Sequence, residues 1–304
     1  AAVMLWLLQQ RHDAQLPTRM LKGVLAAVVV SALIGLQQRL GWNGVLPLWR
    51  DIWESNPTYA RDLRSMAGPV PRVGWPLVEA SYASAWFAAV LGGFIAMFLA
   101  NVRRHLALLG AMIAGFALAN TLGATGMLAA GVCVVVTLVV VAVALVRMPE
   151  QRGALLYRLV LASLVCVCVG LGCFLVLRHG GLLGPAHEVI INVLQGRSQT
   201  MLGDLRPHAD VAAMTLLRES WGLGVGMGSN RASSYFATLA STGGILGLLL
   251  FCIAATVQMG RLARHALHRP TAPSVFFLGS ILTALVAVGI AIPDHNWPVF
   301  WILL

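Results

Sequence analysis

The ionisable residues between positions 197 and 231 are of the types that bind phosphate groups. In chain order they are Arg197, Asp204, Arg206, His208, Asp210, Arg218, Glu219 and Arg231. The whole chain has a single lysine, Lys22, so the cations of this segment are all arginines. Arginine binds phosphate through two parallel hydrogen bonds and stays charged at any pH. Several arginines around a wet cavity at the membrane surface would suit a lipid that carries a pyrophosphate.

A helix is predicted within this arginine-rich segment. Apolar residues recur at helical spacing over residues 208–220, and Arg218 falls on the same face as Val211 and Met214. We expect part of that face to be packed. Arg206 would then lie at the N-terminal end of the helix.

An alternating glycine segment follows, with the sequence WGLGVGMGSNR. Its glycines are Gly222, Gly224, Gly226 and Gly228. The spacing differs from the dinucleotide-binding fingerprint, and no strand–helix–strand pattern surrounds it. Alternating glycines let a backbone bend sharply and approach another group closely. Ser229 or Asn230 is predicted to cap the next helix, whose N-terminus, with Arg231, would favour an anion. The alternative is a tight turn at the membrane surface with close helix packing.

A second candidate region lies at the end of the segment 41–75 and continues through GWPLVEASYASAW, residues 74–86. The acids and arginines within WRDIWESNPTYARDLRSM have helical spacing, which is typical of an amphipathic helix on the membrane surface. Arg72 precedes the apolar segment and Glu79 lies just inside it, where an ionisable group is costly unless it is paired or lines a wet cavity. The two side chains either form a structural pair or belong to a functional pocket, and we favour the pocket.

The elements that must position these residues are membrane-spanning helices. Hydrophobic residues make up 59% of the chain and charged residues 11%, against about 25% charged residues in a soluble domain. Apolar stretches long enough to span a bilayer lie at about 23–39, 76–100, 106–122, 127–146, 159–177, 233–257 and 274–292. Partial stretches at 1–9 and from Trp297 lead us to expect a fragment of a longer membrane protein, with further helices at both ends.

The distribution of charge predicts the orientation. The loops at 10–22, 102–105, 147–158 and 258–273 carry eleven basic and two acidic residues, whereas the opposite loops carry ten arginines and nine acids. Because cytoplasmic loops are enriched in Lys and Arg, the first set is predicted to be cytoplasmic. The high pI then reflects topology, and no nucleic-acid partner is expected. Segments 41–75 and 178–232 become two larger periplasmic loops of a single membrane domain, 1–304.

Three smaller features have structural explanations. All five cysteines lie in apolar spans without metal-type spacing to histidine, so no metal or other cofactor is expected. Residues 120–126, NTLGATG, form either a plain external turn or the wall of a polar vestibule. Gly243 and Gly247 form a GxxxG pair, which predicts a helix–helix contact.

Four motifs in this order resemble the bacterial O-antigen ligase/polymerase superfamily. They are EASYASAWFA, TLGATGMLAAGV, RESWGLGVGMGSNRASSYFATLASTGGILGLLLF and PDHNWPVFW, and the resemblance covers roughly residues 65–304. It implies an all-α, polytopic integral membrane helix bundle similar to the glycosyltransferase C fold. It also implies a multi-pass protein of the bacterial inner membrane, with an active site that faces the periplasm.

The resemblance further implies a metal-independent, inverting glycosyltransferase. Such proteins move a glycan from an undecaprenyl-pyrophosphate carrier onto an acceptor glycan at the periplasmic face. Arg72 matches the arginine before the ExSYA motif, Arg206 matches the arginine in the second loop, and Arg231 lies in a GSNRASS form common in exopolysaccharide polymerases. Ligase members carry a histidine where this chain has Ala232 or Ser233. Its absence favours polymerisation over ligation to lipid A-core.

We therefore expect two groups of site residues. The catalytic residues would be Arg206, Arg231, Glu79 and His208, with Glu79 the first choice of general base and His208 or Glu219 the second. The substrate-binding residues would be Arg72, Arg197, Arg218, Glu219, Gly226, Gly228 and Ser229. Expected partners are the lipid-linked glycan donor, the acceptor glycan, the lipid bilayer and a chain-length regulator. The alternatives are a polysaccharide or lipid transporter and a structural membrane subunit.

Overall fold

The structure, a computed structural model, describes residues 15–42, 44–47, 66–67, 70–71, 73, 80–121, 123, 125–135, 153, 160, 201–226, 229–230, 232, 234–268 and 270–291. Its long helices are α2 (Leu16–Trp42), α5 (Ala80–Leu99), α6 (Arg104–Thr121), α10 (Met201–Glu219), α11 (Tyr235–His268) and α12 (Ala272–Ala291). A shorter apolar helix spans Thr125–Val135. Strands β1 (Met66–Ala67) and β2 (Val70–Pro71) form a small antiparallel pair in which Met66 faces Pro71.

The prediction of apolar helices is confirmed where the structure describes the chain. Three described helices are long and apolar enough to cross a membrane: Leu16–Gly41, Tyr82–Leu99 and Tyr235–Ala266. They contain or overlap the predicted spans 23–39, 76–100 and 233–257. Helices α6 and α12 correspond to the spans 106–122 and 274–292. The span 127–146 is described only as far as Val135, and most of 159–177 lies outside the described residues.

Helices α5 and α12 pack closely and antiparallel at the centre of the fold. A Cβ on Gly279 of α12 would lie 2.5 Å from the carbonyl oxygen of Gly92 and 2.7 Å from the Cβ of Ala96 on α5. A Cβ on Gly93 would collide with the ring of Phe276. The fully buried rings of Phe94 and Phe276 meet edge to face, with centroids 5.0 Å apart. Small residues thus bring the two backbones together, as is usual between membrane helices.

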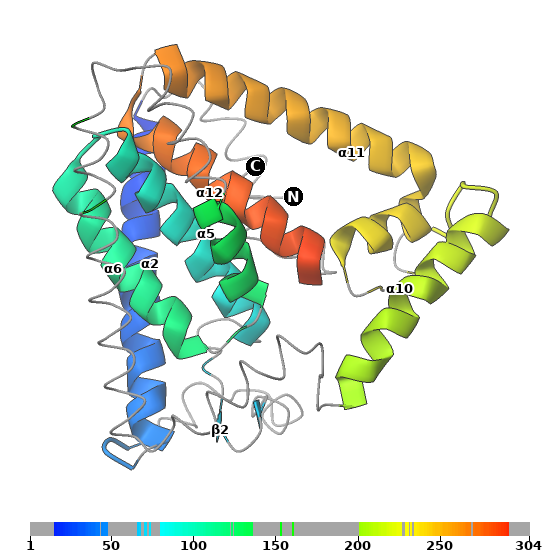
Figure 1. The fold of residues 1–304 in the computed structure, drawn as a ribbon, viewed down its shortest axis with the longest axis horizontal. Coiled ribbons are helices and arrows are strands. Elements are labelled where there is room, and N and C mark those ends of the chain that lie inside the picture. Colours follow the sequence, from blue (N-terminus) through cyan, green and yellow to red (C-terminus); the bar gives the residue numbers. More distant parts are fainter. Residues whose placement is uncertain are drawn as a thin grey trace.

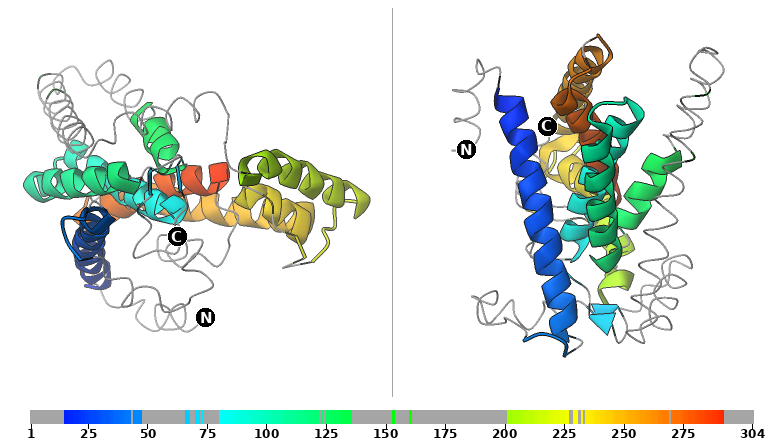
Figure 2. Two further views of the ribbon diagram at one scale, coloured as in Figure 1. Left: turned by 90° about the horizontal axis from the view of Figure 1, so that it is seen from below. Right: turned by 90° about the vertical axis from the view of Figure 1, so that its left-hand side faces the viewer.

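The other helices pack around this pair, and the bundle is elongated in one direction (Figure 1). Helix α6 packs on α5, α2 contacts both α6 and α12, and α11 packs on α12. Helix α10 packs on α11 and lies at the end of the molecule opposite α6 (Figures 1 and 2). Among the described helices, α11 therefore lies between α10 and the central pair and links them.

The described basic segments gather at one end of the bundle. The start of α2, the end of α11 and the start of α12 line a common cavity. The turn Asn101–Arg103 follows α5, whose C-terminal end lies beside the start of α12 because these helices are antiparallel. The predicted charge asymmetry thus has a structural counterpart. The assignment of this end to the cytoplasm stays a prediction.

Candidate functional site

A break in α11 is the central feature of the region that carries the predicted site. Gly244 has φ 70° and ψ −177°, so the helix is interrupted between a first piece that ends at Gly243 and a second that begins at Ile245. Figure 1 shows the short first piece beside α10 and the long second piece running on from the bend. A break removes hydrogen bonds from the backbone groups around it, and an apolar environment requires that these groups find other partners.

The glycine segment supplies those partners. The N–H of Val225 donates to the carbonyl oxygen of Ser241 at 2.9 Å, and the N–H of Gly226 donates to that of Thr242 at 3.0 Å. In return, the N–H of Ile245 donates to the carbonyl oxygen of Gly222 at 2.9 Å. Three backbone hydrogen bonds therefore fix residues 222–226 against the interrupted helix.

The glycines are required by both conformation and space. Gly222, Gly224 and Gly226 have φ values of 79°, 81° and 95°, a region that side chains disfavour. A Cβ on Gly224 would lie 2.6 Å from the carbonyl oxygen of Thr242, and a Cβ on Gly244 would lie 2.6 Å from that of Gly222. The predicted sharp bend and close approach are confirmed, and the group approached is the backbone of α11. This geometry is the close packing that the alternative interpretation described, and the predicted anion site is not tested by it.

Helix α10 carries several of the predicted site residues. The helix predicted over 208–220 is present but begins earlier, at Met201, so Arg206 lies within it as the sixth residue and not at its N-terminal end. The prediction that the face of Val211 and Met214 is packed was wrong. These two side chains are 65% and 48% exposed, while Ala213 is fully buried. Ala213 clusters with Ala232 and Ala237, which places the side of α10 that contacts α11.

The end of α10 leads directly into the glycine segment. The N–H of Gly222 donates to the carbonyl oxygen of Leu217 at 2.8 Å, and the N–H of Trp221 donates to the carbonyl oxygen of Arg218 at 3.1 Å. These are the two bonds of a Schellman motif, in which the residue at the position of Trp221 has a positive φ. Trp221 has φ 55°, where glycine is usual, and its side chain is 92% exposed. Arg218 and Glu219 are exposed beside this turn.

The cap of α11 differs from the prediction. The hydroxyl of Ser234 accepts the N–H of Ala237 at 3.3 Å, so Ser234 is the capping residue. Ser229 instead donates to the carbonyl oxygen of Val225 at 2.8 Å, and the Asn230 amide donates to the Ser241 hydroxyl at 3.0 Å. Both residues therefore brace the glycine segment, and the expectation that one of them caps the helix was wrong.

The structure brings together some predicted site residues and separates others. Arg218, Glu219, Gly226 and Ser229 belong to the α10 end and the glycine segment, whereas His208 lies ten residues before Arg218, about 15 Å along the helix axis. The side chain of Arg206 is outside the described part. The remaining predicted residues lie outside the described residues: Arg72, Glu79, Arg197, Gly228 and Arg231.

The segment next to Arg72 has one described anchor. Val73 is 1% exposed and packs against α2, where a Cβ on Gly35 would lie 3.1 Å from its side chain. Helices α2 and α10 lie at different ends of the long dimension (Figure 2). The described residues therefore do not place this anchor beside α10, and convergence of Arg72 with Arg206 and Arg231 stays a prediction.

A buried arginine was missed as a feature of the sequence. Arg39 is only 2% exposed, and its guanidinium donates to the carbonyl oxygen of Asn120 at the end of α6, at 2.8 Å. A cation at a helix C-terminus satisfies a free carbonyl and interacts favourably with the helix dipole. The signal was an arginine within the last turn of an apolar span, a position that is costly unless the charge is satisfied.

The turn after α6 has the bonds of a plain turn. The Thr121 hydroxyl donates to the carbonyl oxygen of Leu118 and accepts the N–H of Gly123. The N–H of Gly126 donates to the Ser84 hydroxyl at 3.1 Å. Thr121 and Thr125 are buried. Of the two interpretations of residues 120–126, these contacts favour the structural one over the polar vestibule.

Comparison with family models finds no match to this chain, and comparisons with curated proteins and with solved structures find none either. The resemblance to the O-antigen ligase/polymerase superfamily therefore stays a prediction from the motifs. Within the described residues, no three His, Cys, Asp or Glu side chains come together as the ligands of a metal ion would.

The GxxxG pair was also interpreted wrongly for the described residues. A Cβ on Gly247 would meet nothing within 4 Å, and one on Gly243 would meet only Leu239 of its own helix. The residue with a structural requirement is Gly244, which lies between them. A repeat of small residues predicts packing, but it carries no signal for a helix break that depends on a partner twenty residues earlier.

Proposed function

We propose that this chain is a polytopic inner-membrane glycan polymerase with a glycosyltransferase C-like fold. It would transfer an oligosaccharide from an undecaprenyl-pyrophosphate carrier to an acceptor glycan at the periplasmic face. The observation that carries the proposal is the docking of the glycine segment into the break of α11 through three backbone hydrogen bonds. That docking fixes the C-terminal end of α10 to the segment that leads to Arg231, and Arg206 lies on the same helix, about 18 Å along its axis from Arg218.

The proposed reaction is an inverting displacement. The oxygen of an acceptor hydroxyl attacks the anomeric carbon, the bond from that carbon to the pyrophosphate oxygen breaks, and the bonding electrons leave with the pyrophosphate. Glu79 accepts the hydroxyl proton, with His208 or Glu219 as the alternative base. Arg206 and Arg231 stabilise the negative charge that develops on the departing pyrophosphate, and Arg72 is the third predicted cation. Pyrophosphate is a good leaving group, so this step needs no metal ion.

Rigid support of the arginines is what makes such stabilisation effective. Charged donors that are held in place need no reorganisation as the transition state forms. Ser220 makes the segment that precedes Arg231 more rigid, since its hydroxyl accepts the N–H of Gly224 and donates to the carbonyl oxygen of Leu217, both at 3.0 Å. The backbone of residues 220–226, which precedes Arg231 in the chain, is thereby constrained by both α10 and α11.

The break at Gly244 also favours a second candidate function, transport. Interrupted helices in transporters use their unwound carbonyls to coordinate ions and their helix ends to bind substrate. In this chain the carbonyls of Ser241 and Thr242 accept N–H groups from Val225 and Gly226. Because these carbonyls already have backbone partners, the break serves as a joint between segments, and we prefer the transferase.

Reconstitution tests the proposed function. The purified full-length protein in lipid nanodiscs would be incubated with an undecaprenyl-pyrophosphate oligosaccharide, and the products would be separated on a gel. The proposal predicts a ladder whose spacing is one repeat unit. Product formed only when lipid A-core is supplied would assign ligation instead. Substrate that crosses the membrane of a proteoliposome without covalent change would assign transport.

A further inference from the structure

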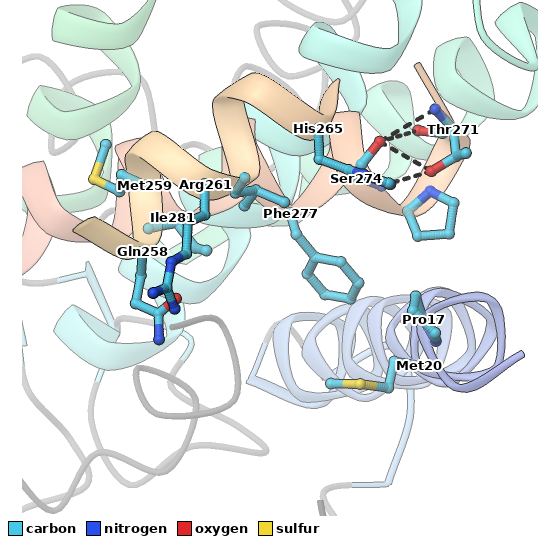
Figure 3. Close-up of a pocket in the computed structure, with 12 residues that line it drawn as sticks. Pro17, Met20, Gln258, Met259, Arg261, His265, Thr271, Ser274, Phe277 and Ile281 are labelled. Carbon is cyan, nitrogen blue, oxygen red and sulfur yellow. Dashed lines mark hydrogen bonds between the residues drawn. The ribbon is translucent and has the colours of Figure 1, made fainter. Parts of the chain in front are cut away.

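A cavity of about 450 Å³ opens at the basic end of the bundle. It is enclosed by the start of α2, the last turns of α11 and the first turns of α12, and Figure 3 shows the residues that line it. This volume lies within the range of about 300–1,000 Å³ that is usual for small-molecule sites. The cavity lies at the end of the fold opposite Arg39 and Asn120, and it includes none of the residues assigned to the transferase site.

The inner wall of the cavity is apolar. Met20 of α2, Leu262 of α11, and Phe277 and Ile281 of α12 supply most of it. In Figure 3 the ring of Phe277 points from α12 toward Met20 across the space between the helices. Such a wall suits a hydrocarbon chain, and it offers no hydrogen bond to a free inorganic ion.

The polar groups form a row along one edge. Gln258, Arg261 and His265 follow each other at spacings of three and four residues, which places them on one face of α11. Figure 3 shows the side chains of Gln258 and Arg261 next to each other. The edge therefore presents a guanidinium, an amide and an imidazole to whatever occupies the cavity.

The hydroxyl groups at the start of α12 have other roles. Thr271 donates its hydroxyl to Ser274 at 2.9 Å, and Ser274 donates its own to the carbonyl oxygen of Thr271 at 3.0 Å. The N–H of Ser274 donates to the Thr271 hydroxyl at 3.3 Å, which caps the helix. The row on α11 thus holds the groups of the lining that remain for binding a ligand.

Arg261 is the one formally charged side chain among the described residues that line the cavity. The sequence contains no Asp or Glu between Asp13 and Asp51, nor between Glu219 and Asp294, so the segments that enclose the cavity carry only cations. No acidic side chain within these segments competes with an anion for Arg261. A ligand that matches the cavity has an anionic group for its edge and an apolar chain for its wall.

We propose that this cavity binds one anionic phospholipid of the bilayer, with its phosphate at Arg261 and an acyl chain between Leu262 and Phe277. Basic pockets between membrane helices on the side that carries the cations are suited to such headgroups. The bound lipid would contact α2, α11 and α12 together. The inference rests on the cavity and its charge, and it stands whether or not the chain is a glycosyltransferase.

The test is lipid binding by the purified, delipidated full-length protein, measured by native mass spectrometry. Phosphatidylglycerol is compared with phosphatidylcholine of the same acyl chains, and inorganic phosphate serves as a competitor. The variants are Arg261→Gln and Arg261→Lys, and the matched control is Arg264→Gln, an exposed arginine on the same helix that does not line the cavity. Circular dichroism verifies that each variant keeps its helical content.

We expect phosphatidylglycerol to bind the wild type more tightly than phosphatidylcholine. Arg261→Gln should weaken this binding about five-fold, while Arg261→Lys and Arg264→Gln should leave it nearly unchanged. Equal binding of the two lipids would overturn the proposal. So would equal losses in Arg261→Gln and Arg264→Gln, which would indicate general attraction to a basic surface. Complete displacement by inorganic phosphate would reduce the site to one for a free ion.

Discussion

Gly224 and Gly244 face each other so closely that neither position has room for a side chain. A Cβ on Gly224 would lie 2.5 Å from the backbone nitrogen of Gly244, and both residues have a φ that disfavours other amino acids. The pair joins the segment after α10 to the interrupted helix α11. If this joint organises the proposed site, then its integrity controls both the stability of the fold and the activity.

Gly224→Ala should therefore destabilise the protein. The positive φ costs a side chain about 1–2 kcal/mol, and overpacking against the backbone adds about 1–3 kcal/mol. Thermal unfolding of the purified protein in detergent measures the change. The matched control is Gly247→Ala, where a Cβ meets nothing within 4 Å. That control should be neutral or slightly stabilising, because alanine suits a helix better than glycine does. Equal effects of the two substitutions would contradict the close joint.

Trp221→Gly should stabilise the fold by about 0.5–1 kcal/mol. Trp221 occupies the left-handed position of the Schellman motif, and glycine adopts this conformation without the steric penalty of a side chain. Its side chain is almost fully exposed, so little packing is lost. The midpoint of thermal unfolding should rise. A fall in that midpoint would mean that the indole ring makes stabilising contacts with lipid or detergent that outweigh the backbone strain.

Ser234→Ala should cost about 1 kcal/mol, as expected for the loss of a helix cap. Its hydroxyl accepts the N–H of Ala237 at the start of α11. Ser229→Ala is the comparison, since the Ser229 hydroxyl is exposed and bonds only to a neighbouring carbonyl. Chemical unfolding curves of both variants would rank them. A larger loss for Ser229→Ala would restore the cap that the sequence suggested.

Arg39→Ala should destabilise the fold by about 2–3 kcal/mol. The substitution removes a hydrogen bond from a charged donor and leaves the Asn120 carbonyl at the buried end of α6 without that partner. Arg19→Ala, which removes an exposed arginine at the other end of α2, should change stability by less than about 0.5 kcal/mol. Activity per folded molecule should persist in Arg39→Ala. A loss of turnover at unchanged stability would instead move Arg39 into the functional site.

The apolar helices were predictable because hydropathy registers length and composition directly. Their ends were less so. Helix α2 begins at Leu16, not at residue 23. Helix α11 continues to His268, not to 257, because QMGRLARHALH is more polar than the preceding span but has no helix-breaking proline. No proline occurs in α11, and the next one in the sequence is Pro270. An apolar stretch in the sequence marks the part of a helix that suits lipid, and the helix can extend beyond it into polar residues.

The break in α11 was not predictable from its own residues. STGGILG is compatible with a continuous helix, and Gly244 departs from helical geometry where residues 222–226 supply alternative hydrogen bonds. The two segments are far apart in sequence, so local pattern cannot register their pairing. The glycine segment did signal a close approach, although not its partner. The roles of the arginines depend on a ligand, and they remain predictions from residue type and motif.

The most direct measurement of the central claim is the initial rate of polymer formation by Arg206→Ala in the reconstituted assay. The matched control is Arg264→Ala, which removes an arginine at the basic end of the bundle, away from α10. Loss of one preorganised charged donor should lower the rate about 100-fold or more, while protein yield and helical content stay at wild-type levels. The control should retain the wild-type rate. A wild-type rate and chain-length distribution in Arg206→Ala would contradict the account.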